Sequence, residues 1–330
     1  CLKPTLAMWR FWMKKIVITG GAGFIGSHLV DYFVAAYPEA EVVVIDKMTY
    51  AADFRYVTHH MNNDKFNLAV GDICDLSLCN KMLSGADLLI HAAAESHVDN
   101  SFQSSLEFSR TNVLGTHTLM QASLDQAVGK IIHVSTDEVY GEVAEGSVDE
   151  MGAFSPTNPY SASKAAAEMI VYGYIQSFKL PAVIVRANNM FGTRQFPEKL
   201  IPKSIMRLMA GKKVTLHGDG LNKRTFLAVH DFCEAVDLLV KKGALGQAYN
   251  IGTEQEYQNI EIAKILCEFY DLSHANYVSY IKDRPFNDSR YCVDYSKISK
   301  LGWRAKIDLK DQLPELITWY ELYQSNFSDL

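Results

Sequence analysis

The chain has 330 residues, of which 48% are hydrophobic and 21% charged, and its formal net charge is −6. This length allows one large domain or two interlocked domains, and the composition is that of an ordinary globular protein. The negative charge argues against a general attraction to nucleic acid or to an anionic membrane, so a polyanionic ligand needs a local basic pocket. No apolar run approaches the roughly 18 residues that cross a bilayer. We therefore expect a cytoplasmic protein with no nucleic-acid and no membrane partner.

The cysteines and the N-terminus carry no further motif. The six cysteines are scattered, with no CxxC and no histidine pair at zinc spacing, so we expect reduced thiols and no metal site. Residues 1–12 form an N-terminal tail that lacks the small-residue cleavage site of a signal peptide.

A dinucleotide-binding fingerprint follows this tail. Residues Lys15–Thr19 predict a strand that runs into a glycine-rich turn, and a helix continues to about Ala36. Glycines let the backbone approach a pyrophosphate, whose charge is met by the helix N-terminus. The expected contacts are Gly20, Gly23, Phe24, Ile25 and Gly26. A second strand, Glu41–Ile45, ends in Asp46, which would bind the ribose hydroxyls and favour NAD over NADP, although Lys47 softens that preference.

The next two predicted strands, Phe66–Val70 and Asp87–Ile90, also end in candidate cofactor contacts. Asp72 either meets the adenine or caps the segment that follows it. The small residues after the second strand would let a cofactor lie against the backbone. The further expected contacts are Ile73, Ala92 and Ala94. The loop Glu95–Ser101 is too polar for a core, so we expect either substrate contact by Ser96, His97 and Asp99 or a capped loop.

The stretch from Ile131 to Lys164 holds the candidate catalytic residues. Ile131–Val134 predicts a buried strand that ends in Ser135, Thr136, Asp137 and Glu138, and open α/β sheets place their chemistry just outside such strand ends. Pro159 then opens a helix, with Asn158 as its expected N-cap, so that Tyr160 and Lys164 share one helix face.

These residue types suit alcohol oxidation. A cation one turn from a phenol favours phenolate, so Tyr160 would act as general base while Thr136 hydrogen-bonds the same substrate oxygen. A solvated helix face beside a simple turn is the alternative interpretation. The dinucleotide fingerprint upstream is what favours the catalytic one.

The alternation of strands and helices continues to a strand at Val183–Arg186. It predicts an α/β fold with a Rossmann-like, doubly wound parallel sheet. Residues 13–186 would form the cofactor-binding domain, and 187–330 mainly a smaller C-terminal α/β substrate-binding domain, some segments of which return to the first. The helices expected at Leu106–Ala127 and Tyr160–Phe178 either pair in a homodimer or only cover the sheet.

Cations are spread over three segments of the second half. Lys199, Arg224 and Arg284 follow loops and proline turns where a diphosphate could be gripped. Each alone would be a solvated surface charge. As a set they favour a nucleotide-linked substrate.

Seven motifs in order resemble the extended short-chain dehydrogenase/reductase family and, within it, the nucleotide-sugar 4,6-dehydratases. The likeness covers residues 14–320. The motifs are TGGAGFIGS at 19–27, AAESHVD at 93–99, STDEVYG at 135–141, YSASK at 160–164, QFPEKLIP at 195–202, YNIG at 249–252 and RPxxDxRY at 284–291.

The resemblance implies that a bound NAD is used and regenerated while a nucleoside-diphosphate glucose becomes a 4-keto-6-deoxy sugar nucleotide. Tyr160 would deprotonate the 4-hydroxyl, with Lys164 lowering its pKa and Thr136 holding the oxygen. Glu138 would take the proton from carbon 5, Asp137 would protonate the departing 6-hydroxyl, and hydride would return to carbon 6. The implied substrate contacts are Asn189, Lys199, Leu200, Arg224, Asn250 and Arg284, in addition to Ser96 and His97.

Several alternatives stay open at this stage. The chain reads Arg224-Thr225-Phe226 where bacterial relatives commonly read RDW, so the substrate base is either uracil or thymine. A sugar-nucleotide 4-epimerase or a related decarboxylase shares the Tyr-Lys pair. Asp137 and Glu138 argue against the epimerase, which has no use for an acid and base pair at carbons 5 and 6. A catalytically inactive NAD-sensing protein would not need every catalytic position intact.

Overall fold

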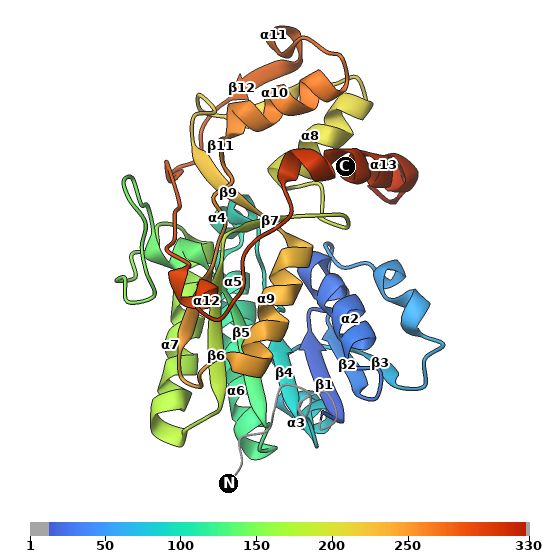
Figure 1. Ribbon diagram of the computed structural model, residues 1–330, viewed down its shortest axis with the longest axis vertical. Coiled ribbons are helices and arrows are strands. Elements are labelled where there is room, and N and C mark those ends of the chain that lie inside the picture. The colour runs from blue at the N-terminus through green and yellow to red at the C-terminus, as the bar shows by residue number, and fades with distance from the viewer. Residues whose placement is uncertain (1–12, 328–330) are drawn as a thin grey trace.

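The computed structural model describes residues 13–327. Its largest sheet has seven strands in the order β10-β6-β5-β4-β1-β2-β3, and every pairing is parallel (Figure 1). The strands are β1 (Lys15–Thr19), β2 (Glu41–Asp46), β3 (Phe66–Val70), β4 (Leu88–His91), β5 (Lys130–Thr136), β6 (Ala182–Ala187) and β10 (Ala248–Ile251). The strand order reverses between β1 and β4, as the doubly wound prediction requires.

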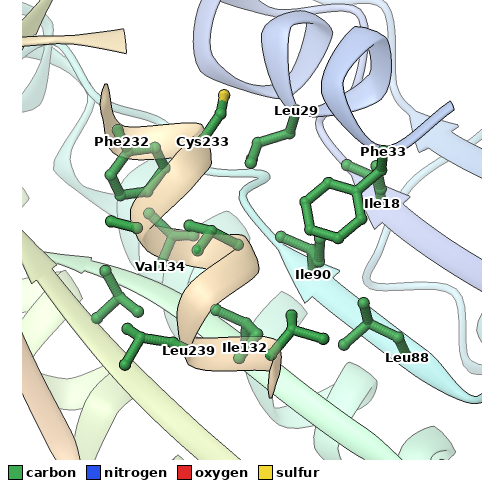
Figure 2. Packing of buried hydrophobic residues seen from close by; sticks show 14 of the residues in the cluster. Ile18, Leu29, Phe33, Leu88, Ile90, Ile132, Val134, Phe232, Cys233 and Leu239 are labelled. Atoms are coloured by element: carbon green, nitrogen blue, oxygen red, sulfur yellow. The ribbon is translucent and has the colours of Figure 1, made fainter. Parts of the chain in front are cut away.

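Helices cover both faces of this sheet. Alternate residues of a strand point to opposite faces, so Ile16 and Ile18 of β1 join one core cluster while Val17 joins the other. The first cluster packs under α2 (Phe24–Ala36) and α9 (Val229–Lys242), and Figure 2 shows Phe33 and Leu239 of these helices over the strands. The second cluster packs under α3 (Leu76–Leu83), α6 (Thr116–Asp125) and α7 (Pro159–Phe178).

A second lobe lies beyond the carboxyl ends of these strands, at the top of Figure 1. Its strands form two small sheets, β11-β9-β7 and β12-β8, and a separate core joins them to four helices. The strands are β7 (Asn189–Phe191), β8 (Val214–His217), β9 (Lys223–Ala228), β11 (Glu256–Gln258) and β12 (Val278–Ile281), and the helices are α8 (Leu200–Met209), α10 (Asn259–Phe269), α11 (His274–Tyr277) and α13 (Leu309–Tyr323). Between them α9 and β10 return to the large sheet, so the two lobes are joined at several points.

The helix expected at 106–127 is divided. It consists of α5 (Ser105–Phe108), a π-helix η3 (Ser109–Gly115) and α6. The wider turn carries buried Asn112, whose amide donates to the Glu95 carbonyl oxygen at 3.0 Å and to Ser163 Oγ at 2.8 Å. π-Turns often mark functional sites, and this one ties the Glu95 loop to α7.

The remaining elements are short. They are α4 (Val98–Gln103), α12 (Ser296–Ser299) and the 3₁₀ turns η1 (Phe54–Tyr56), η2 (Thr58–His60), η4 (Asp137–Tyr140) and η5 (Gln324–Phe327). Within residues 13–327 no helix is long and apolar enough to cross a membrane. The five cysteines in that range, Cys74, Cys79, Cys233, Cys267 and Cys292, are all free. The tail proposed for residues 1–12 lies outside the described residues.

Candidate active site

A cavity of about 410 Å³ lies where the carboxyl ends of the large sheet face the second lobe. It is lined by residues from the glycine turn after β1, from the ends of β2 to β6, and from the lobe segments 195–203, 215–217 and 284–291. Ligand sites in open α/β sheets lie at this edge. The cavity is therefore the candidate active site.

The glycine turn is shaped for close approach. Gly20 has φ +72°, and a Cβ there would lie 2.7 Å from the Cα atom of Ala93, while a Cβ on Gly26 would lie 1.9 Å from the Gly20 carbonyl oxygen. A Cβ on Gly23 would meet nothing closer than 3.4 Å, so this glycine leaves space rather than relieving a clash. The turn thus brings backbone against the cavity at the N-terminus of α2.

The end of β2 presents the expected acid. Asp46 lines the cavity, and its carboxylate accepts hydrogen bonds from the backbone N–H groups of Ala22 at 2.9 Å and Met48 at 2.8 Å. Burial raises the pKa of this carboxyl, and the two backbone bonds oppose that shift. Asp46 is thus held with its carboxylate fixed at the cavity wall.

Asp72 does not cap the helix that follows it. Asp75 caps α3 by accepting from the Leu78 N–H at 3.0 Å, whereas Asp72 accepts from the Cys74 N–H and forms a 3.1 Å ion pair with Lys47. The capping alternative for Asp72 is therefore wrong, and Asp72 faces the cavity.

The first half of the cavity fits a dinucleotide of the NAD type. Every predicted cofactor contact lines it: Gly20, Gly23, Phe24, Ile25, Gly26, Asp46, Lys47, Asp72, Ile73, Ala92, Ala94, Tyr160 and Lys164. Ser135, also in the wall, has a buried hydroxyl with no hydrogen-bond partner. A glycine turn, the buried carboxylate of Asp46 and an orphaned hydroxyl together form a suitable donor and acceptor set for such a group.

The start of α7 places the candidate base. Asn158 and Ser161 form a capping box, in which the Asn158 side chain accepts from the Ser161 N–H at 2.9 Å. This confirms Asn158 as the N-cap and fixes Tyr160 and Lys164 at the cavity wall.

The expected effect of Lys164 on Tyr160 is absent from this structure. The Lys164 ammonium donates to the Val134 carbonyl oxygen at 2.7 Å, and burial lowers its pKa to about 8. Burial and the Glu138 charge raise the pKa of Tyr160, and only its hydrogen bond with Thr136 acts in the opposite direction. The prediction of a lowered tyrosine pKa was wrong here because desolvation outweighs a cation that is itself engaged by a backbone carbonyl.

Strand β5 runs two residues beyond the predicted end, and both carboxyls lie in the turn η4 that follows. Glu138 lines the cavity, accepts from the Asn158 side-chain amide at 3.4 Å, and has a pKa raised by burial. A carboxyl with a raised pKa at a cavity wall suits proton transfer.

Asp137 occupies a different position from Glu138. It is not among the lining residues of the cavity: its carboxylate accepts from Asn188 Nδ2 at 2.7 Å and from Thr136 Oγ at 3.2 Å, and both partners do line the wall. Burial and the neighbouring Glu138 charge raise the pKa of Asp137 to about 7. Asp137 thus meets the cavity wall through Thr136 and Asn188 and does not line it itself.

The second half of the cavity carries the predicted cations. Lys199 Nζ donates to the Ser96 carbonyl oxygen at 2.7 Å, Arg284 Nε lies 2.6 Å from Asp99 Oδ1, and the Arg224 guanidinium stacks 4.6 Å from the Tyr291 ring centroid. The other predicted substrate contacts in this wall are Ser96, His97, Asn189 and Leu200. Three cations from separate segments therefore converge on one cavity.

Asn250 does not belong to this wall. It is fully buried, and its amide donates to the carbonyl oxygens of Val148 and Asp294, each at 3.0 Å, while its oxygen accepts from the Tyr140 hydroxyl at 2.8 Å. Its prediction as a substrate contact is corrected: all of its hydrogen-bonding groups serve the interior.

Several lining residues were missed by the sequence analysis. Glu198, Asp288 and Tyr291 lie inside motifs already noted, so their proximity to Lys199, Arg284 and Arg290 was the available signal. Phe286, 47% exposed at the cavity, had none.

Away from the cavity, Asp31, His59 and His60 bring three possible metal-ligand atoms within 4.8 Å of one another. The sequence analysis expects no metal. The Asp31 carboxylate is also ion-paired with Arg194 at 2.8 Å, a cation that opposes a second positive charge there.

Comparison with known proteins identifies the family of the chain. The sequence matches the family described as GDP-mannose 4,6 dehydratase over residues 17–316. The chain belongs to this family.

The relatives of this chain include proteins named for dTDP-glucose and proteins named for UDP-glucose. A human dTDP-D-glucose 4,6-dehydratase is 41% identical, covering 93% of this chain and 90% of that protein. A trifunctional UDP-glucose 4,6-dehydratase/UDP-4-keto-6-deoxy-D-glucose 3,5-epimerase/UDP-4-keto-L-rhamnose-reductase of Arabidopsis thaliana is also 41% identical over 93% of the chain. The chain spans only 47% of that plant relative.

Two solved structures match most of this fold. A dTDP-glucose 4,6-dehydratase of Streptomyces venezuelae with NAD bound superposes with a TM-score of 0.92 at 38% identity, covering 94% of this chain and 98% of that one. A UDP-glucose 4-epimerase of Thermotoga maritima reaches 0.85 at 26% identity, covering 94% and 99%.

Proposed function

We propose that the protein catalyses the NAD-dependent dehydration of a nucleoside-diphosphate glucose to the 4-keto-6-deoxy sugar nucleotide. The observation that carries this proposal is the grouping of Tyr160, Thr136 and Glu138 at one strand end, with Asp137 immediately behind them. Alcohol oxidation alone needs a base at one oxygen. Removal of water needs a further base and acid, and this site holds both.

The cofactor half of the cavity supports NAD. The glycine turn would meet the pyrophosphate and Asp46 the ribose. A bound NAD would supply the acceptor for the hydride that leaves carbon 4 and, once reduced, the donor of the hydride that carbon 6 receives. A related dehydratase and a UDP-glucuronic acid 4-epimerase have been solved with NAD, which agrees with this assignment.

The residues at the end of β5 divide the proton transfers. Tyr160 would remove the proton of the 4-hydroxyl, and Thr136 would hold that oxygen. Glu138 would take the proton from carbon 5, which the 4-ketone makes acidic. Asp137, half protonated near pH 7, would be the source of the proton for the departing 6-oxygen.

The second half of the cavity would hold the nucleoside diphosphate. Lys199, Arg224 and Arg284 would grip the diphosphate, because guanidinium forks match phosphate oxygens. In this structure Arg284 is paired with Asp99, so binding would exchange that carboxylate for phosphate. Relatives named for UDP-glucose and for dTDP-glucose are equally similar, and either base remains a candidate.

A direct assay tests the proposal. Purified protein with NAD is incubated with UDP-glucose and, separately, with dTDP-glucose, and products are measured by mass spectrometry. We expect loss of one water from at least one of them, and the preferred substrate identifies the base. Unchanged mass with both sugars contradicts the proposal.

Glu138→Gln tests the elimination step. It keeps the shape of the side chain but removes the base, so we expect the dehydration rate to fall at least ~100-fold while NAD stays bound. NAD content, read from the supernatant after denaturation, is the control. Normal turnover by Glu138→Gln would remove Glu138 from the mechanism.

A 4-epimerase is the second candidate, favoured by the fold shared with the Thermotoga enzyme. Its product would have the mass of the substrate, so the same spectra separate the two reactions. The paired carboxyls at residues 137 and 138 favour dehydration.

We further propose that the protein works as a cytoplasmic homodimer. The free cysteines of the described chain suit a reducing compartment. Apolar side chains stand exposed on neighbouring helices: Leu106 is 85% exposed on α5, Leu114 51% on η3, and Met169 50% on α7. Helices α5, η3 and α7 contact one another, and a second copy would cover these side chains.

A further inference from the structure

One buried carboxylate of the cavity wall takes no part in the proposed reaction. Asp288 is 2% exposed and lines the cavity. Its Oδ2 atom accepts a hydrogen bond from Thr157 Oγ1 at 2.7 Å and another from the Tyr291 hydroxyl. Its Oδ1 atom is buried and has no hydrogen-bond partner within residues 13–327. Burying a carboxylate is costly unless hydrogen bonds compensate it, and the two hydroxyls that do so here come from different parts of the molecule.

On the side of the second lobe, Asp288 is connected to one of the cations proposed to hold the diphosphate. The Tyr291 ring, whose hydroxyl donates to Asp288, has the Arg224 guanidinium 4.6 Å from its centroid. Arg224 also donates to Asn287 Oδ1 at 3.1 Å, and Asn287 precedes Asp288 in the chain. The segment that carries Asp288 is therefore tied to the diphosphate half of the cavity.

On the side of the large sheet, Asp288 is connected to the carboxyl that would take the carbon 5 proton. Thr157 directly precedes Asn158, the N-cap of α7, and the N–H groups of both residues donate to Ser161 Oγ, each at 3.2 Å. The Asn158 side-chain amide donates to Glu138 Oε2 at 3.4 Å. Thr157 is not one of the residues that line the cavity. Its hydroxyl can therefore influence the reaction through Asp288 and not by contact with the sugar.

Backbone hydrogen bonds join the same two segments farther from α7. The Val143 N–H donates to the Arg290 carbonyl oxygen at 3.0 Å, and the Val148 N–H donates to the Cys292 carbonyl oxygen at 3.1 Å. These bonds do not involve the side chain at position 157. A substitution there should therefore loosen the contact beside the active site and leave the two segments paired.

We propose that Asp288 is a positioning residue, which holds the start of α7, and Glu138 with it, in a fixed place relative to the cations that bind the diphosphate. Hydrogen bonds to an ionised acceptor are roughly twice as strong as neutral ones. One carboxylate oxygen that accepts from both Thr157 and Tyr291 thus makes a firm joint between α7 and the second lobe. The proposal rests on the proposed function. It predicts that the joint matters for removal of the carbon 5 proton and little for substrate binding.

The test breaks the joint at Thr157. Thr157→Val removes the hydroxyl and nearly keeps the shape, whereas Thr157→Ser keeps the hydroxyl. Thr318→Val is the matched control, because the Thr318 hydroxyl donates to the Pro314 carbonyl oxygen at 2.8 Å within α13, far from the joint in the chain. For each protein kcat and KM of dehydration are measured by mass spectrometry, and a single turnover is followed by the near-ultraviolet absorbance of reduced nicotinamide.

We expect Thr157→Val to lower kcat roughly tenfold and to change KM by less than about threefold, because displacement of a catalytic group costs rate more than binding. Reduced nicotinamide should accumulate during its single turnover, since oxidation at carbon 4 precedes the step that needs Glu138. Thr157→Ser and Thr318→Val should stay within about threefold of the unmodified enzyme in both constants.

Asp288→Asn provides a second variant. It weakens both contacts, so it should lower kcat and also raise KM, because Tyr291 then supports Arg224 less firmly. Substitutions that act through one contact are not additive. Thr157→Val combined with Asp288→Asn should therefore be slower than Asp288→Asn by no more than about twofold.

Three results would overturn the joint. They are unchanged kinetics of Thr157→Val, a lower kcat of Thr157→Val without accumulation of reduced nicotinamide, and losses that multiply in the double variant. Losses confined to Asp288→Asn would show instead that Asp288 contacts the substrate itself. Failure of the unmodified enzyme to dehydrate either sugar overturns the proposed function, and the role of Asp288 falls with it.

NAD content and circular dichroism of the variants separate these outcomes from misfolding. If Thr157→Val does not fold, Thr157→Ala takes its place, because it also lacks the hydroxyl and adds no bulk. The same fall in kcat and the same accumulation of reduced nicotinamide are then expected, and their absence overturns the joint.

Discussion

Two neighbouring carboxyl groups, Asp137 and Glu138, are buried at the end of β5 without a direct ion pair. Burial is the largest cause of the raised pKa at both residues, and for Asp137 the Glu138 charge adds to it. Such an arrangement costs stability, because charge is removed from water without a paired cation. It also keeps a proton available near neutral pH, which is what an eliminating acid requires.

The stability cost of Asp137 has a pH dependence whose sign can be worked out. Its folded pKa of about 7 lies above the ordinary 3.8, so below pH 3.8 the group is protonated in both states and costs nothing. Between these two values the folded state is penalised increasingly as pH rises. Asp137→Asn, which cannot ionise, should therefore be more stable than the unmodified protein at pH 8 and gain distinctly less at pH 5, where only part of the penalty has developed.

Thermal unfolding midpoints at the two pH values check this, with equal NAD content in both proteins. The exposed Glu145→Gln is the matched control and should show no such difference. A gain from Asp137→Asn that is the same at both pH values would mean that the Asp137 pKa is not raised.

Sequence reasoning at this scale identified residue types but not which way the side chains face. Asp137 and Glu138 are adjacent in the sequence, yet only Glu138 lines the cavity, because the 3₁₀ turn η4 turns successive side chains in different directions. The pKa of Tyr160 could not be predicted from the sequence either. It depends on burial, and the Lys164 ammonium is hydrogen-bonded to the Val134 carbonyl oxygen. The glycine turn was predictable because its chemistry is local.

At the scale of elements, the turn η4 is held from beneath by a buried network. Arg186 of β6 is ion-paired with Glu168 of α7, donates to the Tyr140 hydroxyl at 2.5 Å, and lies 5.0 Å from the Tyr140 ring centroid. Tyr140 in turn donates to Asn250 of β10. The network links β6, α7 and β10 to the last residue of η4.

Tyr140→Phe should therefore destabilise the protein by roughly 1–3 kcal/mol, because it leaves buried groups of Arg186 and Asn250 each short of one partner. It should also lower the dehydration rate, since η4 carries Asp137 and Glu138. The measurements are denaturant unfolding and steady-state kinetics.

Tyr172→Phe is the matched control. The Tyr172 hydroxyl accepts from the same guanidinium at 3.3 Å in a less buried position, so its loss should cost less than about 1 kcal/mol. Equal effects of the two substitutions would show that η4 does not depend on this network.

The same network explains why Asn250 was misassigned from the sequence. Asn250 was assigned to the substrate through the resemblance of its YNIG motif, but β10 returns to the large sheet and places this residue in the interior. The division of the 106–127 helix was missed for a similar reason. Its π-helix is tied by Asn112 contacts to residues far along the chain.

At the scale of the whole molecule, the cavity lies between the sheet edge and the second lobe. The sheet edge supplies the glycine turn and the residues at the strand ends, and the lobe supplies the three cations. The alternation of strands and helices predicted the sheet well, because a parallel strand buried on both faces has a distinctive apolar run. The lobe was less predictable. Its strands are only three to six residues long and come from separate segments, so only its convergent cations indicated where they meet.

The proposed homodimer is supported by exposed apolar side chains on one face of the molecule. Leu106 and Met169 are exposed on adjoining helices, and burying them against a second copy would be favourable by roughly 25 cal/mol for each Å² of apolar surface removed from water. The protein at micromolar concentration should then have twice the 37.0 kDa mass of one chain, as measured by light scattering during gel filtration. Leu106→Glu with Met169→Glu should shift it to the monomer, because two charges would be desolvated in the interface. Leu322→Glu, at a side chain that is also exposed but lies on α13 in the other lobe, should leave the dimer intact. A monomeric mass for the unmodified protein would contradict the assembly and leave these helices as an outer cover of the sheet.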